Sequence, residues 1–136
     1  MVSLARAIAA QQLLPSATCL SHTSAALVQG LTMWTREPDV YLAVSGHPRL
    51  TTTTLPPFRY PASGVPVPTE SAPSETNPIR LHRRQLQLRD EEIEVVGGVP
   101  VTSVLRTAFD CACDEPPHNA LSIADAALNR HCRPDP

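Results

Sequence analysis

Arg106, Asp110 and Asp125 form the sharpest combination of charged residues in the chain. Arg106 and Asp110 lie four residues apart, so on a helix their side chains can meet. A cation near a helix N-terminus opposes the helix dipole, so we expect Arg106 to have a further acidic partner, and Asp125 could reach it from the next helix. Since no nucleophile or base accompanies these groups, the pattern predicts an ion-pair network that fixes how the two C-terminal helices dock.

A basic cluster follows a proline-rich segment and comprises Arg80, His82, Arg83 and Arg84, with Arg89 close behind. Apolar and basic residues alternate over residues 79–82, which predicts a strand with one basic, solvated face. Such a face could contact nucleic-acid phosphates or the acidic surface of a partner protein. The alternative is an ordinary solvated strand face, partly neutralised by the acidic residues within 90–94.

Five potential metal ligands gather near the C-terminus: Cys111, Cys113, His118, His131 and Cys132. Residues two apart on a helix point about 200° away from each other, so Cys111 and Cys113 cannot both ligate one ion. The chain also lacks the Cys-x-x-Cys pair typical of structural zinc sites. We therefore expect buried free thiols and no metal.

His22 follows Ser21, a predicted helix cap, and has no obvious partner nearby in the sequence. We expect a cap-region histidine rather than a catalytic base. The sequence has no recognisable catalytic triad, glycine-rich phosphate loop or metal-binding helix, and no cofactor is expected.

Composition narrows the possible functions further. The formal charge is −2, and all 11 basic residues are arginines. The absence of lysine excludes a phosphate-loop lysine, a Schiff-base lysine and the lysine of restriction-type nuclease centres. Gln11 and Gln12 interrupt the N-terminal apolar run before a signal core could form, and no run approaches the roughly 20 apolar residues of a membrane span. We expect a cytoplasmic protein with no membrane partner.

The pattern of elements predicts one small α+β domain over residues 1–136. Helices are expected at 3–13, at 21–31 with Gly30 in the left-handed position past its end, from 102 or 103 onward, and at 118–130. Strands are expected at 17–20, 39–44, 79–84 and 99–101, giving a sheet of about three or four short strands with three or four helices. Residues 46–78 contain a threonine run and many prolines, and we expect a long exposed or disordered insertion that forms no ladder.

Apolar spacing also predicts which helix faces are buried. The stripe on the helix after Ser103 is Leu105, Ala108, Phe109 and Ala112. The stripe on the last helix is Leu121, Ala124 and Leu128, with Ile123 and Ala127 beside it.

Five motifs resemble the AbiEi-type antitoxin proteins of type IV toxin–antitoxin systems, which are common in actinobacteria. In order, they are Ser-His-x-Ser-Ala-Ala-x-x-x-Gly-Leu at 21–31, Val-Tyr-Leu-Ala-Val at 40–44, Arg-Leu-His-Arg at 80–83, Gly-Val-Pro-Val-Thr-Ser-x-x-Arg-Thr-x-x-Asp at 98–110, and Ala-Asp-Ala-Ala-Leu at 124–128. The resemblance implies a non-catalytic antitoxin or transcriptional-regulator-like domain whose partners are a nucleotidyltransferase-like toxin and operator DNA.

The sequence departs from that family at both ends. About 20 residues precede the Ser-His motif, too few for the winged helix that family members usually carry. At the other end the chain stops just after Asn129-Arg130, so we expect a truncated member. One alternative is the N-terminal accessory region of a nuclease-like, restriction-endonuclease-related protein whose catalytic half is absent. The other is a degenerate remnant without activity.

Overall fold

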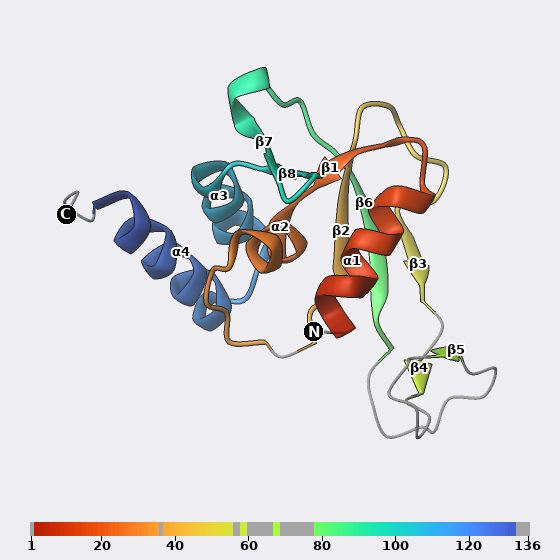
Figure 1. Ribbon diagram of the computed structural model, residues 1–136, viewed down its shortest axis with the longest axis horizontal. Helices are drawn as coiled ribbons and strands as arrows, with labels where there is room; N and C mark the ends of the chain where they lie inside the picture. The colour runs from red at the N-terminus through yellow and green to blue at the C-terminus, as the bar shows by residue number, and fades with distance from the viewer. Residues whose placement is uncertain (1, 36, 56–57, 60–66, 69–77, 133–136) are drawn as a thin grey trace.

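The computed structural model describes residues 2–35, 37–55, 58–59, 67–68 and 78–132 (Figure 1). Within them lie four α-helices: α1 (Val2–Leu13), α2 (His22–Gln29), α3 (Val104–Asp114) and α4 (Pro117–Cys132). The strands are β1 (Ala17–Leu20), β2 (Val40–Val44), β3 (Thr52–Thr54), β4 (Phe58–Arg59), β5 (Val67–Pro68), β6 (Arg80–Gln85), β7 (Ile93–Val96) and β8 (Val99–Thr102). A 3-10 turn, η1 (Asp90–Glu92), precedes β7.

Six strands form one mixed sheet in the order β3-β6-β2-β1-β8-β7, and β4 pairs with β5 separately. At the centre, β1 pairs antiparallel with β2 and parallel with β8, where Leu20 lies opposite Val101. β2 and β6 are parallel, with Tyr41 opposite His82. The sheet is therefore built largely from strands that are distant in the sequence.

The main hydrophobic core lies between one face of this sheet and helix α1 (Figure 1). Strand alternation sends Val40, Leu42 and Leu81 to that face, where Ala7 of α1 is fully buried against them. All five residues of β2 are buried, as its almost continuous apolar sequence predicted.

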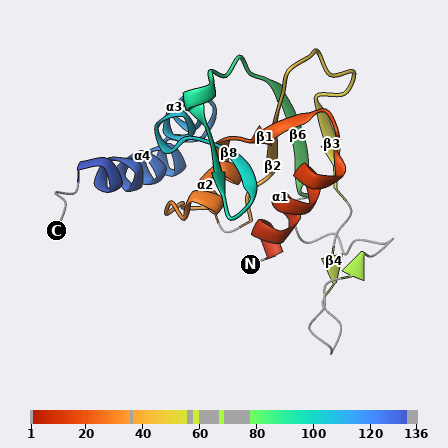
Figure 2. The ribbon, with the colours of Figure 1, turned by 45° about the horizontal axis from the view of Figure 1, so that its top comes forward.

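Helices α2, α3 and α4 pack together into a second core. In both views α4 lies at the opposite end of the molecule from β3 (Figures 1 and 2). Gly30 ends α2 with φ of 72°, the left-handed conformation that was predicted, and Ser103 caps α3 by accepting a bond from the Arg106 N–H. No helix in the described part of the chain is long and apolar enough to cross a membrane.

The predicted α+β class is confirmed, but the prediction of three or four strands was too low. The hairpin of β7 and β8 adds a strand after η1, with Gly97 and Gly98 at positive φ in its turn. The expectation that residues 46–78 form no ladder was wrong for Thr52–Thr54, which pair with β6 as edge strand β3. Threonine is β-branched and suits an edge strand. Residues 56–57, 60–66 and 69–77 of that expected insertion lie outside the described residues.

The large residues of the predicted apolar stripes of α3 and α4 are exposed, so this prediction was wrong for them, whereas Ile123 and Ala127, predicted beside the α4 stripe, are buried. Leu105 and Phe109 of α3 are 58% and 62% exposed, and Leu121 and Leu128 of α4 are 69% and 58% exposed. Polar contacts fix the rotation of each helix instead. The Thr102 and Thr107 hydroxyls bond at 2.7 Å and turn α3 toward β8. The Asn119 side-chain oxygen accepts the Trp34 N–H at 2.9 Å and turns α4 toward the chain after α2.

We predict that Ile123→Ala and Leu121→Ala differ sharply in stability, although both shorten an aliphatic side chain of α4. Ile123 is fully buried, so its truncation should lower the free energy of unfolding by about 2–5 kcal/mol. Leu121→Ala should change it by no more than about 0.5 kcal/mol. Urea denaturation of both variants measures the difference. Equal losses would show that α4 is rotated away from this arrangement.

Candidate functional site

The basic residues predicted as a binding patch lie on β6, but the strand divides them between its faces. Leu81 is buried against α1, so the alternation predicted for residues 79–82 is present. Arg80, His82 and Arg84 share the opposite face, whereas Arg83 lies on the Leu81 side, where its guanidinium donates to the Thr53 hydroxyl at 2.8 Å. The four residues therefore do not form one flat patch.

Three of these residues nevertheless meet at the end of β6. Edge strand β3 reaches His82, and the Arg83 N–H still donates to the Thr51 carbonyl, but Arg84 and Gln85 have no partner in β3. A groove of about 440 Å³ lies at this end of β6. Its lining comprises His47, Pro48, Thr51, Thr52, His82, Arg83, Arg84 and Gln85, and we call it the basic groove. No carboxylate is among these described lining residues, so the two arginines give the groove a positive charge.

Arg80 lies outside the basic groove, at the start of β6. It lines a second pocket with Glu37, Asp39, Tyr41 and Glu115. Because β6 extends by about 3.3 Å per residue, Arg80 and Arg84 face different surroundings. Arg80 is the predicted binding residue that the structure separates from the rest.

A stack of three rings lies between these two pockets, on the sheet face away from α1. Tyr41 stacks on His22 with ring centroids 4.7 Å apart and on His82 with centroids 4.5 Å apart. The His82 Nε2 lies 2.8 Å from Asp39 Oδ2, while Asp39 Oδ1 accepts the Arg80 backbone N–H. An N–H at His82 Nε2 that donates to the Asp39 carboxylate satisfies this geometry.

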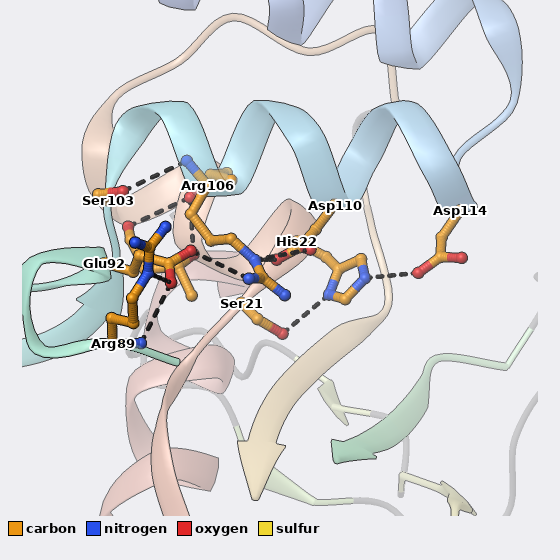
Figure 3. Close-up of polar contacts among 10 residues, drawn as sticks. Ser21, His22, Arg89, Glu92, Ser103, Arg106, Asp110 and Asp114 are labelled. Atoms are coloured by element: carbon orange, nitrogen blue, oxygen red, sulfur yellow. Dashed lines mark hydrogen bonds and ion pairs between the residues drawn. The ribbon is translucent and has the colours of Figure 1, made fainter. Parts of the chain in front are cut away.

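His22 has the polar partners that the sequence did not reveal (Figure 3). Its Nδ1 lies 2.9 Å from Ser21 Oγ, and its Nε2 lies 2.7 Å from Asp114 Oδ2. Asp114 is 92 residues away in the sequence, at the end of α3, so no local pattern could identify it. The His22 backbone has φ of 50°, a left-handed conformation that costs a non-glycine residue about 1–3 kcal/mol.

The combination of Ser21, His22 and Asp114 has the composition of a hydrolase triad, but not its accessibility. Ser21 and Ser24 are fully buried and His22 is 1% exposed, so a substrate carbonyl cannot reach the Ser21 hydroxyl. Both ring nitrogens of His22 are engaged, which holds the strained turn from β1 into α2 against α3. The geometry supports a structural tie rather than nucleophilic catalysis.

Arg106 has the further acidic partner that its position predicted, but this partner is Glu92 (Figure 3). The guanidinium lies 3.0 Å from Glu92 and 3.0 Å from Asp110. Asp125 is exposed on α4, where it accepts a bond from Asn129, so the ion-pair network joins α3 to η1 rather than to α4. The reason is again the rotation of α4, which presents Asn119 and Ile123 to the core.

The network also shifts the pKa values of its members. The Arg89 backbone N–H and the Arg106 guanidinium hold the pKa of Glu92 below its usual value. Burial lowers the pKa of Arg106, but hydrogen bonds to Glu92 and Asp110 outweigh this effect and raise it overall. The charged forms of both residues are therefore stabilised.

The prediction of buried free thiols is confirmed for Cys111 but was wrong for Cys113, which is exposed. Cys19 and Cys111 are buried and free, and Cys113 is exposed and free. Burial raises the pKa of Cys19 to about 11 and also raises the pKa of Cys111. In the described part of the chain, no group of three His, Cys, Asp or Glu side chains could hold a metal ion. The side chains of His131 and Cys132 lie outside the described residues.

Comparison of the chain with family models, curated proteins and solved structures finds no match. The AbiEi-type resemblance therefore stays a prediction, and the function has to be argued from the surfaces themselves.

We predict that Arg106→Ala lowers the free energy of unfolding by about 1–3 kcal/mol at pH 7, because it leaves the buried Asp110 carboxylate without its cation. The difference should shrink in acid. A carboxyl group whose folded-state pKa is lowered adds stability above its ordinary pKa, and this is lost as the pH falls through the folded value. For Glu92 that loss begins below its ordinary value of 4.5.

Urea denaturation between pH 7 and pH 3 measures this difference. Arg130→Ala, which removes an exposed guanidinium from α4, is the matched control and should track the unmodified protein at every pH. A midpoint urea concentration at pH 7 that Arg106→Ala leaves unchanged would contradict the stabilising role of this ion-pair network.

Proposed function

We propose that this chain is a non-catalytic domain that binds the phosphate backbone of duplex DNA through the basic groove. The observation that carries the proposal is the convergence of His47, His82, Arg83 and Arg84 on one groove without a lining carboxylate among the described residues. With a net charge of −2, the chain as a whole does not attract DNA. A local concentration of cationic groups is then required.

The groove suits phosphate groups rather than bases. Guanidinium groups bind phosphate oxygens through paired hydrogen bonds, and the Thr51 and Thr52 side chains add hydroxyl donors. Contacts to phosphate position a protein on DNA without reading its sequence. The proposed role is therefore to anchor the domain on DNA, which agrees with the DNA-associated role that the AbiEi-type resemblance implies.

We expect binding to a labelled 20-base-pair duplex to weaken as salt increases, because each phosphate contact releases about 0.9 counterion from B-DNA. The Arg84 side chain is exposed and makes no hydrogen bond or ion pair with a described residue, so Arg84→Gln should leave stability unchanged. It should weaken binding and reduce the slope of log K against log salt by about one. Fluorescence anisotropy over a salt series measures both quantities.

Arg130→Gln is the matched control, because it removes the same charge from α4, away from the groove. It should leave the slope unchanged. Equal effects of Arg84→Gln and Arg130→Gln would indicate nonspecific attraction and contradict the groove, and so would binding that does not depend on salt.

A second candidate function is the binding of a partner protein, which the exposed apolar face of α3 and α4 favours. We use the name apolar face for four exposed side chains taken together: Leu105 and Phe109 of α3, and Leu121 and Leu128 of α4. The Arg106 guanidinium lies over the Phe109 ring, 5.8 Å from its centroid, and α4 also carries the exposed polar residues Asp125 and Asn129. Large apolar side chains accompanied by polar ones are the usual composition of a protein interface. The AbiEi-type resemblance supports a nucleotidyltransferase-like toxin as the occupant.

We expect Phe109→Glu to abolish capture of the protein encoded beside this chain when the two are co-expressed, because it places a charge in the apolar centre. Leu50→Glu is the matched control, since Leu50 is also largely exposed but lies far from α3 along the chain and outside this face. Light scattering tests the competing occupant: a dimer of the chain alone that Phe109→Glu dissociates would assign the face to a second copy. Capture of the neighbour by both variants would contradict this use of the face.

A further inference from the structure

A second pocket, opposite in charge to the basic groove, lies where β2 and β6 begin. Its volume is about 570 Å³. Its polar lining consists chiefly of Glu37, Asp39, Tyr41, Arg80 and Glu115, and we call it the acidic pocket. These residues come from the chain after α2, from the two parallel strands and from the junction of α3 and α4. The pocket is thus assembled by the fold rather than by one loop.

Tyr41 is the group in this pocket that indicates a ligand. The residue is only 9% exposed, and His22 and His82 cover the two faces of its ring. The ring edge and hydroxyl are therefore the parts that the pocket can reach. The hydroxyl retains access to solvent, yet it makes no hydrogen bond within the described part of the chain. A hydroxyl that opens into a pocket from a ring fixed on both faces, without a protein partner, is available to a ligand.

The environment of the hydroxyl is acidic. Burial, followed by the carboxylates of Glu115 and Asp39, raises the pKa of Tyr41 to about 12. The hydroxyl therefore stays protonated at neutral pH and can either donate or accept a hydrogen bond. The same carboxylates that act on Tyr41 line the pocket and act on whatever enters it.

Three carboxylates face one guanidinium in the pocket, which makes it a site for cations. Asp39 already accepts bonds from the Arg80 backbone and from His82. Glu115 uses one oxygen to accept from Asn119, and Glu37 has no partner within the described residues. Oxygens of Glu37 and Glu115 therefore remain available. The Arg80 guanidinium is exposed and forms no ion pair with a described carboxylate, so it offsets only part of their charge from the rim of the pocket.

The pocket suits an organic cation better than a metal ion. Its carboxylates do not form a group able to hold a metal among the residues described. Pro38, Pro78 and Ile79 add apolar walls that an alkyl chain can contact. A ligand with several N–H donors on a short hydrocarbon stem matches both parts.

We propose that the acidic pocket binds an alkylguanidinium or alkylammonium group, which hydrogen-bonds to the Tyr41 hydroxyl and to the carboxylates of Glu37 and Glu115. The group is either a free small cation or the side chain of an arginine or lysine in another protein. The site is independent of DNA binding by the basic groove.

Isothermal titration with n-butylguanidinium, n-butylammonium and the neutral 1-pentanol tests this proposal. Both cations should bind, and 1-pentanol should bind at least about tenfold more weakly, because it lacks the charge. Tyr41→Phe removes only the hydroxyl and keeps the stacked ring, so it should fold normally and weaken cation binding about tenfold. Arg80→Gln removes the cation from the pocket and should strengthen binding.

Asp125→Asn is the matched control, since it removes an exposed carboxylate from α4, and it should bind like the unmodified protein. The tripeptide acetyl-Gly-Arg-Gly-amide distinguishes a protein side chain from a free small cation as the ligand. If it binds as well as n-butylguanidinium, the ligand is a protein side chain, and if only the free ions bind, it is a small molecule. Equal binding of the alcohol and the cations, or no effect of Tyr41→Phe on cation binding, would overturn the proposal.

Discussion

The buried imidazole of His22 is the contact on which both candidate sites depend. Hydrogen bonds to Ser21 and Asp114 hold the ring between the start of α2 and the end of α3. Its face supports Tyr41, and Tyr41 in turn supports His82. Tyr41 lines the acidic pocket and His82 lines the basic groove. The left-handed backbone at His22 adds conformational strain, and it places the ring in contact with all of these neighbours.

The two sites lie at opposite ends of the same pair of parallel strands. Asp39 at the start of β2 belongs to the acidic pocket, and Arg84 near the end of β6 belongs to the basic groove. The hydrogen bond between Asp39 and His82 lies between them and occupies one oxygen of the Asp39 carboxylate. A chain with a small net charge thereby presents one negative and one positive surface, each formed by strand ends that the sheet topology brings together.

The sequence predicted the elements of this fold better than their contacts. Prolines, glycines and cap residues act locally, which is why α2, its Gly30 terminus and β2 were predicted correctly, and why the α3 cap was narrowed to Thr102 or Ser103, of which the structure has Ser103. Contacts between residues distant in the sequence left no such signal. The partner of His22 is Asp114, and the partner of Arg106 is Glu92. Likewise, β3 pairs with β6. The rotation of α3 and α4 was also misjudged, because apolar spacing was assumed to face the core, whereas Thr107 and Asn119 decide which side is buried.

The parallel pairing of β1 with β8 has a consequence for how the chain folds. β1 and β2 leave the ribosome early and can pair with each other, but their outer neighbours, β8 and β6, are synthesised much later. Until then this apolar pair has two open edges, which are sites for misassociation. A sheet completed by such distant segments has a high contact order, so its folding is expected to be slow compared with that of a helical domain of similar size.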